Sequence, residues 1–165
     1  RELLRGDRSP INLRLLLNET VQLWKPQAER KSISMALSFD PEDREITMLG
    51  HSELLIQVMN NLIDNALRYC PAGSKVHLHA LQSEHGLQIS VEDNGPGIPA
   101  SERPLVVRRF YRGDQSPNAQ PEQAAGSGLG LAIAFEIMTR LGGRFEITDP
   151  VSGQGTRIEL MLPTD

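Results

Sequence analysis

The feature that most restricts the fold is an apolar stripe between residues 52 and 69. Apolar side chains recur there at spacings of three and four residues, at Leu54, Leu55, Val58, Met59, Leu62, Ile63 and Ala66. This is the period of an α-helix with one broad apolar face, and Ser52 is suited to cap its first turn. The segment therefore predicts an amphipathic helix over 52–69 that must bury this stripe.

The opposite side of this helix carries polar residues of an unusual kind. They follow one another at helical spacing and so share one side: Gln57, Asn61, Asn65, Arg68 and Tyr69. Asparagine is a mediocre helix former, so helix stability does not explain two asparagines in register. A solvated polar face is the alternative interpretation.

The groups on this face suit a complex of Mg²⁺ with phosphate. The side-chain oxygen of Asn65 is a hard neutral ligand, and Mg²⁺ accepts such ligands beside water and phosphate oxygens. Arg68 offers a fork of donors to phosphate. Tyr69 is on the same turn, where it could close over the sugar or the phosphate.

A second informative stretch is Asp93-Asn94-Gly95-Pro96-Gly97-Ile98, which follows the apolar alternation of a predicted strand over 87–91. A carboxylate only accepts hydrogen bonds and the exocyclic amine of adenine donates them, so Asp93 is predicted to select adenine. Gly95 and Gly97 allow the backbone to lie flat against a ring. Taken alone, the hexapeptide also fits an ordinary hairpin turn.

The other predicted elements complete a chain of helices and strands. We expect a helix over 11–30 with Trp24 in the core, a helix after Gly130 that ends at Gly142-Gly143, and strands over 33–39, 44–49, 75–81, 144–149 and 156–162. The turn Pro41-Glu42-Asp43 suggests that the first two strands form a hairpin. Residues 1–10 are charged, end in Ser9-Pro10 and are predicted to be a linker.

Residues 94–128 predict a long segment with at most a short helical turn near 101–110. It is rich in Pro, Gly, Ser, Asn and Gln, and a segment of this length inside a compact domain is usually functional. Its arginines, at 103, 108, 109 and 112, have no acidic residue among them, which suits a polyphosphate, although a solvated surface is the alternative. We expect residues 99–125 to be a mobile lid that orders over a bound triphosphate. The segment ends in Gly126-Ser127-Gly128-Leu129-Gly130-Leu131, whose backbone N–H groups at a helix start suit an anion.

Composition excludes several classes of protein. The 165 residues are 39% hydrophobic, which predicts one domain with a proper core. A net charge of −4 argues against a nucleic-acid-binding or anionic-membrane surface. The single cysteine, Cys70, excludes an internal disulfide and is interpreted as a small, partly buried apolar residue. His77 and His79 lie two apart on a strand, and without an evident third ligand an exposed strand face is favoured over a metal site.

Four motifs in order together resemble the ATP-binding catalytic domain of sensor histidine kinases, where they are called the N, G1, F and G2 boxes. They are Asn61-Leu62-Ile63-Asp64-Asn65-Ala66-Leu67-Arg68-Tyr69, Asp93-Asn94-Gly95-Pro96-Gly97, Phe110-Tyr111-Arg112 and Gly126-Ser127-Gly128-Leu129-Gly130-Leu131. The resemblance covers residues 11–165, and Gly153 to Thr156 match a further glycine turn of the family. It implies a two-layer α/β sandwich, with a mixed sheet of about five strands faced by three helices and a long ATP lid.

The resemblance also implies roles for individual residues and two cofactors, ATP and Mg²⁺. Asn65 would hold Mg²⁺, and Asn61, Asn65 and Arg68 would be the catalytic set. The residues expected to bind the nucleotide are Asn61, Asn65, Arg68, Tyr69, Asp93, Gly95, Gly97, Ile98, Phe110, Arg112, Gly126, Ser127, Gly128, Leu129, Gly130 and Thr156. Two departures from the family pattern are Val107, where the F box usually begins with phenylalanine, and His51, where an acidic residue is common.

The resemblance further implies that this chain is one part of a longer kinase. The family's phosphoacceptor is a histidine followed by an acidic residue in a separate helical hairpin, and none of the four histidines here has that context. Residues 1–10 would be the remnant of the connection to that hairpin. We expect a monomeric fragment outside the membrane, cut from a membrane-anchored homodimer, on the cytosolic side of a bacterial inner membrane, with the hairpin and a response regulator as partners.

Related ATPases with this fold carry a glutamate at the position of Asn61, where it acts as general base on water. An amide cannot take a proton from water, whereas phosphoryl transfer mainly needs positioning and charge neutralisation. The sequence therefore favours a kinase that transfers the γ-phosphoryl group of ATP to a histidine. An ATPase, or a catalytically silent nucleotide-sensing module, is the alternative.

Overall fold

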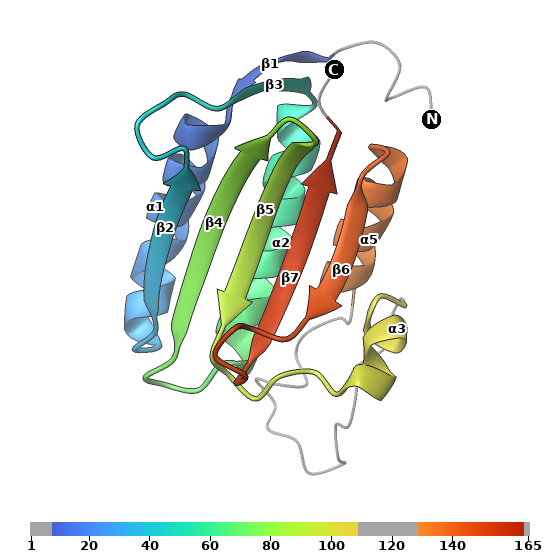
Figure 1. Ribbon diagram of the computed structural model, residues 1–165. Helices are drawn as coiled ribbons and strands as arrows, with labels where there is room; N and C mark the ends of the chain where they lie inside the picture. The colour runs from blue at the N-terminus through green and yellow to red at the C-terminus, as the bar shows by residue number, and fades with distance from the viewer. Residues whose placement is uncertain (1–7, 109–128, 164–165) are drawn as a thin grey trace.

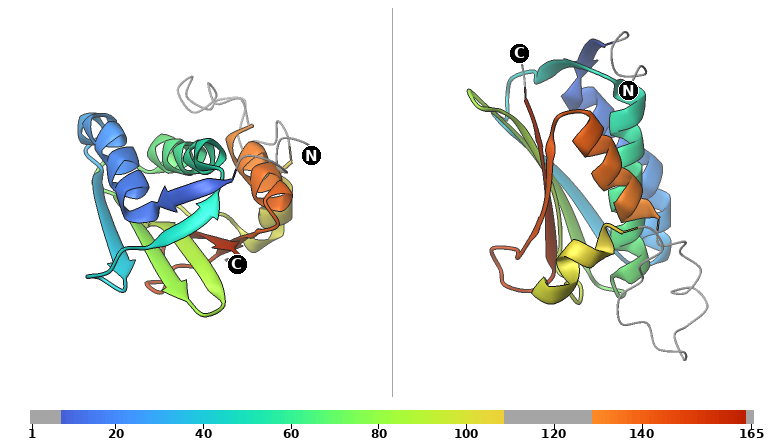
Figure 2. Two further views of the ribbon diagram at one scale, coloured as in Figure 1. Left: turned by 90° about the horizontal axis from the view of Figure 1, so that it is seen from above. Right: turned by 90° about the vertical axis from the view of Figure 1, so that its right-hand side faces the viewer.

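The computed structural model describes residues 8–108 and 129–163. Within these ranges three helices, α1 (Leu13–Arg30), α2 (Ser52–Tyr69) and α5 (Gly130–Arg140), cover one face of a five-stranded sheet. Figures 1 and 2 show that all three lie on the same side and that no described helix covers the other face. The predicted two-layer α/β sandwich is confirmed.

The five-stranded sheet is mixed, as expected. Its strands lie in the order β2 (Ser34–Asp40), β4 (Lys75–Ser83), β5 (Gly86–Asp93), β7 (Thr156–Leu162) and β6 (Arg144–Thr148). The β2–β4 pair is parallel and the other three pairs are antiparallel. In this register Asp93, the last residue of β5, lies opposite Thr156, the first residue of β7.

The hairpin expected between the strands near 33–39 and 44–49 does not form. Strand β2 pairs with β4, and β3 (Thr47–Gly50) pairs instead with β1 (Ser9–Asn12) in a separate two-stranded sheet. Two contacts explain the connection. Ile46 is completely buried and its carbonyl accepts from the amide of Leu13 at 2.8 Å, while the Arg14 guanidinium donates to the carbonyls of residues 41, 42 and 44.

The N-terminal boundary also differs from the prediction. Helix α1 begins at Leu13 and not at residue 11, because the Asn12 side chain caps it by accepting from the Leu15 amide at 3.1 Å. Ser9 and Pro10, expected in the linker, form β1 together with the buried Ile11. The folded unit therefore includes residues 9 and 10.

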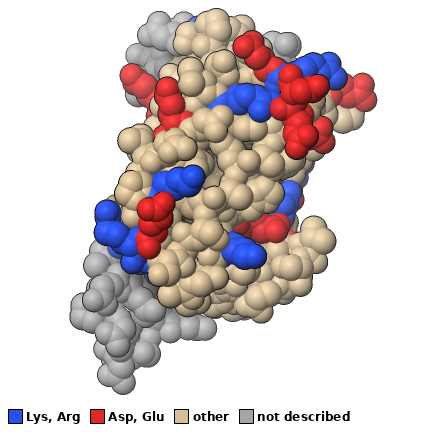
Figure 3. All heavy atoms as spheres, turned by 90° about the vertical axis from the view of Figure 1, so that its left-hand side faces the viewer, with Lys and Arg blue, Asp and Glu red and all other residues tan. Residues whose placement is uncertain are grey.

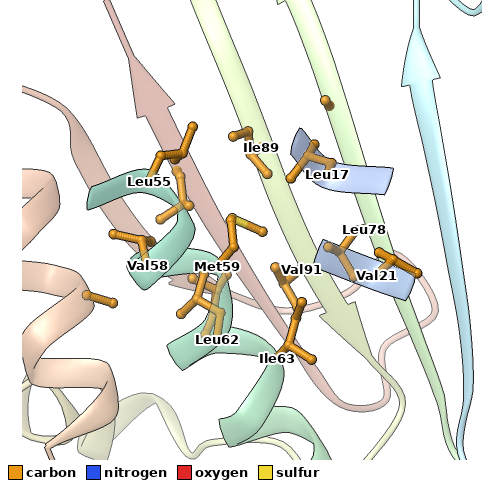
Figure 4. Packing of buried hydrophobic residues seen from close by; sticks show 14 of the residues in the cluster. Leu17, Val21, Leu55, Val58, Met59, Leu62, Ile63, Leu78, Ile89 and Val91 are labelled. Atoms are coloured by element: carbon orange, nitrogen blue, oxygen red, sulfur yellow. The ribbon is translucent and has the colours of Figure 1, made fainter. Parts of the chain in front are cut away.

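The core lies between α2 and the sheet, as the apolar stripe predicted. Figure 4 shows the α2 side chains Leu55, Val58, Met59, Leu62 and Ile63 packed toward Leu78 of β4, toward Ile89 and Val91 of β5, and toward Leu17 and Val21 of α1. Each of the five α2 side chains is at most 2% exposed. Trp24 is partly buried against this core, as expected, and its indole N–H donates to Asn60 Oδ1 at 2.8 Å.

The described surface fits the composition. On the face formed by α1 and β2, basic and acidic side chains are interspersed (Figure 3). None of the described helices combines the length and the apolar character that a membrane span requires.

Candidate functional site

Four structural elements meet at one end of the sandwich and bring the predicted site residues together. Figure 1 shows that β5 and α2 end there, while β7 and α5 begin there. Strand β5 supplies Asp93, β7 supplies Thr156, and the last turns of α2 supply Asn61 and Asn65. Residues far apart in the sequence therefore converge because of strand order and helix direction.

Asp93 is held by main-chain donors at the centre of this end. Its Oδ1 accepts from the amide of Gly95 at 2.9 Å and from the amide of Thr156 at 3.3 Å. Burial raises the pKa of the Asp93 carboxyl above its ordinary value, although hydrogen bonds from Gly95, Cys70 and Thr156 oppose this shift. Both main-chain donors bind Oδ1, so neither of them competes for Oδ2.

Two glycine turns pack against each other around Asp93. Gly155 has φ of +111°, and a Cβ there would lie 1.9 Å from the Asp93 carbonyl oxygen. A Cβ on Gly97 would lie 2.9 Å from the carbonyl oxygen of Gly155. The Gln154 side-chain amide donates to the Gly95 carbonyl at 2.6 Å and ties the two turns together. Side chains are excluded here because the two backbones are in contact.

Asn61 and Asn65 of α2 lie about one turn apart and are both partly buried. The Asn61 Nδ2 is buried and has no hydrogen-bond partner among the described residues. The start of α5 lies against the same residue, since a Cβ on Gly130 would be 3.9 Å from the Asn61 carbonyl oxygen. The structure thus brings together the predicted residues Asn61 and Gly130.

Arg68 and Tyr69 are exposed at the end of α2. The Arg68 Nε donates to Asp64 Oδ2 at 2.9 Å, which forms an ion pair between residues one helical turn apart. The two side chains are 38% and 35% exposed. Asp64 was not predicted to take part. In this structure Asp64 therefore accepts from one nitrogen, Nε, of the guanidinium that was expected to meet phosphate.

The segment after Asp93 is described only in part. A 3-10 turn, η2 (Ala100–Glu102), and helix α3 (Arg103–Val106) form the short helical region that was expected. Arg103 fixes it, because its Nε donates to the Ile98 carbonyl at 3.1 Å and its Nη2 pairs with Asp149 at 2.5 Å. The expected lid beyond residue 108 lies outside the described residues, as do five predicted nucleotide-binding residues, Phe110, Arg112, Gly126, Ser127 and Gly128.

The sequence missed one residue at the centre of the site. Cys70 follows α2 directly, is 7% exposed and hydrogen-bonds to the Asp93 carboxylate. Its pKa is raised to about 12 by burial and by the neighbouring charge of Asp93. Its burial was predicted correctly, but nothing in the local sequence indicated that its neighbour would be Asp93.

The two strand histidines share one hydroxyl as hydrogen-bond partner. His77 and His79 both contact the Ser38 hydroxyl, at 2.7 and 2.6 Å, on the uncovered face of the sheet. Across the described ranges, no three His, Cys, Asp or Glu side chains form a metal-binding group. The donor expected for Mg²⁺ is instead an amide, and the partly buried Asn65 fits this chemistry because its oxygen is neutral and hard.

Comparisons with known proteins agree with this geometry. Residues 50–165 match the family model described as histidine kinase-, DNA gyrase B- and HSP90-like ATPase. The virulence sensor histidine kinase PhoQ of Salmonella typhimurium is 35% identical over 147 residues. That alignment covers 89% of this chain, and the chain spans 28% of the length of that relative.

Two solved structures superpose on nearly the whole chain. The mycobacterial sensor histidine kinase MprB has a TM-score of 0.76 at 28% identity, covering 96% of this chain and 98% of that one. Full-length ShkA in complex with AMPPNP has a TM-score of 0.80 at 27% identity, covering 98% of this chain and 32% of that one.

Proposed function

The chain belongs to the histidine kinase-, DNA gyrase B- and HSP90-like ATPase family as the ATP-binding catalytic domain of a sensor histidine kinase, and we propose that it transfers the γ-phosphoryl group of ATP to a histidine on a separate helical domain. The observation that carries the proposal is the convergence of Asp93, two glycine turns and the asparagines of α2 at one end of the sandwich. The chemistry of each group suits it to bind one part of ATP.

Asp93 is proposed to recognise the adenine ring. Oδ1 is engaged by two main-chain amides, so Oδ2 is the oxygen proposed to accept from the exocyclic amine of adenine. Gly95, Gly97 and Ile98 would line the ring, because the backbone of this turn carries no side chain at the two glycines. Thr156 would hold Asp93 from the opposite strand.

The asparagines are proposed to hold the triphosphate end of ATP. Asn65 would bind Mg²⁺ through its side-chain oxygen, and the metal would neutralise charge on the phosphates. Asn61 has a buried donor without a described partner, which suits a phosphate or sugar oxygen. Arg68 would have to exchange Asp64 for phosphate, and Tyr69 would lie beside it. Leu129 and Gly130 would meet the phosphates at the start of α5, and Phe110, Arg112, Gly126, Ser127 and Gly128 keep their proposed roles.

The proposed reaction needs no base on this chain. A neutral imidazole nitrogen of the acceptor attacks the γ-phosphorus, the bond from that phosphorus to the β,γ-bridging oxygen breaks, and ADP leaves with the bond electrons. The N–P bond that forms makes a phosphoramidate. The side chain at position 61 is an amide and cannot deprotonate water, which favours transfer over hydrolysis in a family that also contains ATPases.

The proposed partners follow from the relatives, which are sensor kinases longer than this chain. The acceptor would be the helical hairpin of the parent kinase, and the phosphoryl group would then pass to a response regulator. Residues before Ser9 would connect to the hairpin. We place this domain on the cytosolic side of a membrane-anchored homodimer, as a monomer when isolated.

The test mixes the chain with ATP, Mg²⁺ and the separately expressed helical hairpin of its parent kinase. We expect slow labelling of the hairpin histidine from γ-labelled ATP, because the high effective concentration provided by the covalent connection is lost. The product should be stable in base and labile in acid. Asp93→Asn should reduce the labelling, and a hairpin whose histidine is replaced by alanine should remain unlabelled.

Two outcomes would contradict the proposal. Rapid release of free phosphate by the chain alone would favour an ATPase, and would require a residue other than Asn61 to activate water. ATP binding without transfer or hydrolysis would favour a silent nucleotide-sensing module.

A further inference from the structure

Cys70 is placed directly behind the carboxylate that the proposed function assigns to adenine. It follows the last residue of α2, where its amide donates to the Ala66 carbonyl at 3.0 Å, so the helix end fixes its backbone. A Cβ on Gly95 would lie 2.8 Å from the Cys70 Sγ and 3.2 Å from the Asp93 Oδ1. The sulfur and the carboxylate oxygen therefore sit against the same glycine, and only glycine leaves room for both.

The thiol lies next to two polar side chains. Cys70 interacts with the Asp93 carboxylate and with the Ser74 side chain, and these two interactions shift the pKa of the thiol in opposite directions. Cys70 and Ser74 are 7% and 5% exposed, so water has little access to either. The pKa of the thiol is about 12, so it keeps its proton at neutral pH and is the donor to the carboxylate.

We propose that Cys70, supported by Ser74, is a positioning residue that orients the Asp93 carboxylate for adenine. The inference rests on the proposed role of Asp93. Among the described residues, the donors to this carboxylate are the amides of Gly95 and Thr156 and the thiol of Cys70. Of these, Cys70 is the only one whose donor can be removed by substitution without changing the backbone.

The position of the thiol matters because Asp93 is partly buried, and this burial disfavours its charged form. A carboxylate in such a place tends to take up a proton or to rotate toward solvent, and either change removes the acceptor that an adenine amine needs. A donor behind the carboxylate opposes both changes. Cys70 therefore acts through Asp93 and has no direct contact with nucleotide in this proposal.

The first experiment examines the carboxyl group without any nucleotide. The pKa of Asp93 is measured by carbon NMR of the side-chain carboxyl in the wild-type chain and in the Cys70→Ala and Cys70→Ser variants. Because the thiol bond lowers the pKa of Asp93, Cys70→Ala should raise it further, and Cys70→Ser, which retains a donor, should restore it toward the wild-type value. An unchanged pKa in Cys70→Ala would overturn the proposal.

The second experiment asks whether the effect reaches the adenine amine. ADP binding is compared with binding of purine riboside 5′-diphosphate, which lacks the exocyclic amine, by titration calorimetry near neutral pH. Cys70→Ala should weaken ADP binding about three- to tenfold, roughly one hydrogen bond, and should leave the analogue nearly unaffected. Cys70→Ser should bind ADP like the wild type.

Equal losses for both nucleotides would mean that Cys70→Ala disturbs the whole pocket, and would overturn the positioning role. Cys70→Val, which fills the space but donates nothing, guards against a simple packing effect and should behave like Cys70→Ala. Failure of the proposed function would look different. In that case the wild-type chain would bind no ADP, while the pKa of Asp93 would still change in Cys70→Ala. Such a result would support the contact between Cys70 and Asp93 and contradict its role in adenine binding.

Discussion

The Asp93 carboxylate shows that a group suited to ligand recognition can be unfavourable for the stability of the fold. Asp93 lies where burial disfavours its charge, and its pKa is raised even though three groups donate to it. A residue that served only the fold would be better as a neutral side chain at this position. The charged form is useful only if a donor arrives from outside, and the adenine amine is the donor that we propose.

We predict that Asp93→Asn weakens ADP binding by about 1 to 3 kcal/mol, the cost of losing one buried hydrogen bond to a charged acceptor. Asparagine has the same shape but presents a donor where adenine also donates. Titration calorimetry at constant Mg²⁺ measures the effect. Affinity equal to the wild type would remove Asp93 from the base site.

The same substitution should change how stability depends on pH. The folded state holds the Asp93 proton more tightly than the unfolded state does, so it binds more protons between the ordinary and the raised pKa. The contribution of Asp93 to the free energy of unfolding therefore falls as pH rises through that window. Asp93→Asn lacks this contribution.

Without nucleotide, Asp93→Asn should thus gain stability relative to the wild type as pH rises through the window. Urea denaturation of both proteins at a series of pH values gives the difference. A constant difference across the window would mean that Asp93 titrates alike in the folded and unfolded states.

Helix α2 shows how one element serves the core and the site at once. Its apolar stripe is buried against the sheet, and Asn61 and Asn65 lie beside that stripe where they are only partly covered. Because helix packing fixes the apolar face, it also fixes the direction of the two amides. The packing of the core therefore holds Asn61 and Asn65 in position at the site.

We predict that Asn65→Ala reduces the affinity for ATP with Mg²⁺ much more than the affinity for adenosine, because it removes a proposed metal ligand and leaves the base site unchanged. Gln57→Ala, an exposed amide two turns earlier on α2, is the matched control and should change neither. Equal losses for both ligands in Asn65→Ala would indicate damage to the helix instead.

The buried stripe of α2 should dominate stability. Leu62 is 1% exposed, so Leu62→Ala should lower the free energy of unfolding by about 2 to 5 kcal/mol through lost burial and a residual cavity. Leu23 on α1 is 78% exposed, and Leu23→Ala should stay within about 0.5 kcal/mol of the wild type. Chemical denaturation measures both, and a small loss in Leu62→Ala would contradict the packing of Figure 4.

At the scale of the whole molecule, the small β1–β3 sheet closes the end opposite the site. Strand β1 directly precedes α1 and strand β3 directly precedes α2, so the pairing of these two strands holds the starts of both helices together (Figure 1). Ile11 of β1 is 4% exposed and belongs to the main core. Strand β1 is therefore part of the folded unit.

We predict that removing residues 1–12 lowers stability by several kcal/mol more than removing residues 1–8 does. The longer deletion loses the pairing with β3, the buried Ile11 and the Asn12 cap of α1. Thermal and urea unfolding of the two truncated chains make the comparison. Equal stability would mean that β1 does not support the fold.

The sequence by itself determined the elements with strong local periodicity. The α2 stripe, the strands β4 and β5 and the place of Asp93 at a strand end are confirmed, because the side chains that set each period are close neighbours along the chain. The order of the motifs predicted the histidine-kinase domain for the same reason, since each motif is read within a few residues.

Only the tertiary structure decided which elements meet. Strand β2 pairs in parallel with β4 although a turn follows it, and Cys70 lies behind Asp93 although 22 residues separate them in the sequence. Asp64 likewise forms an ion pair with Arg68, although the helical spacing had predicted phosphate as the partner of Arg68. Such pairings depend on the free energy gained when segments far apart in the sequence bury their surfaces against each other. The periodicity of one short segment holds no information about this free energy.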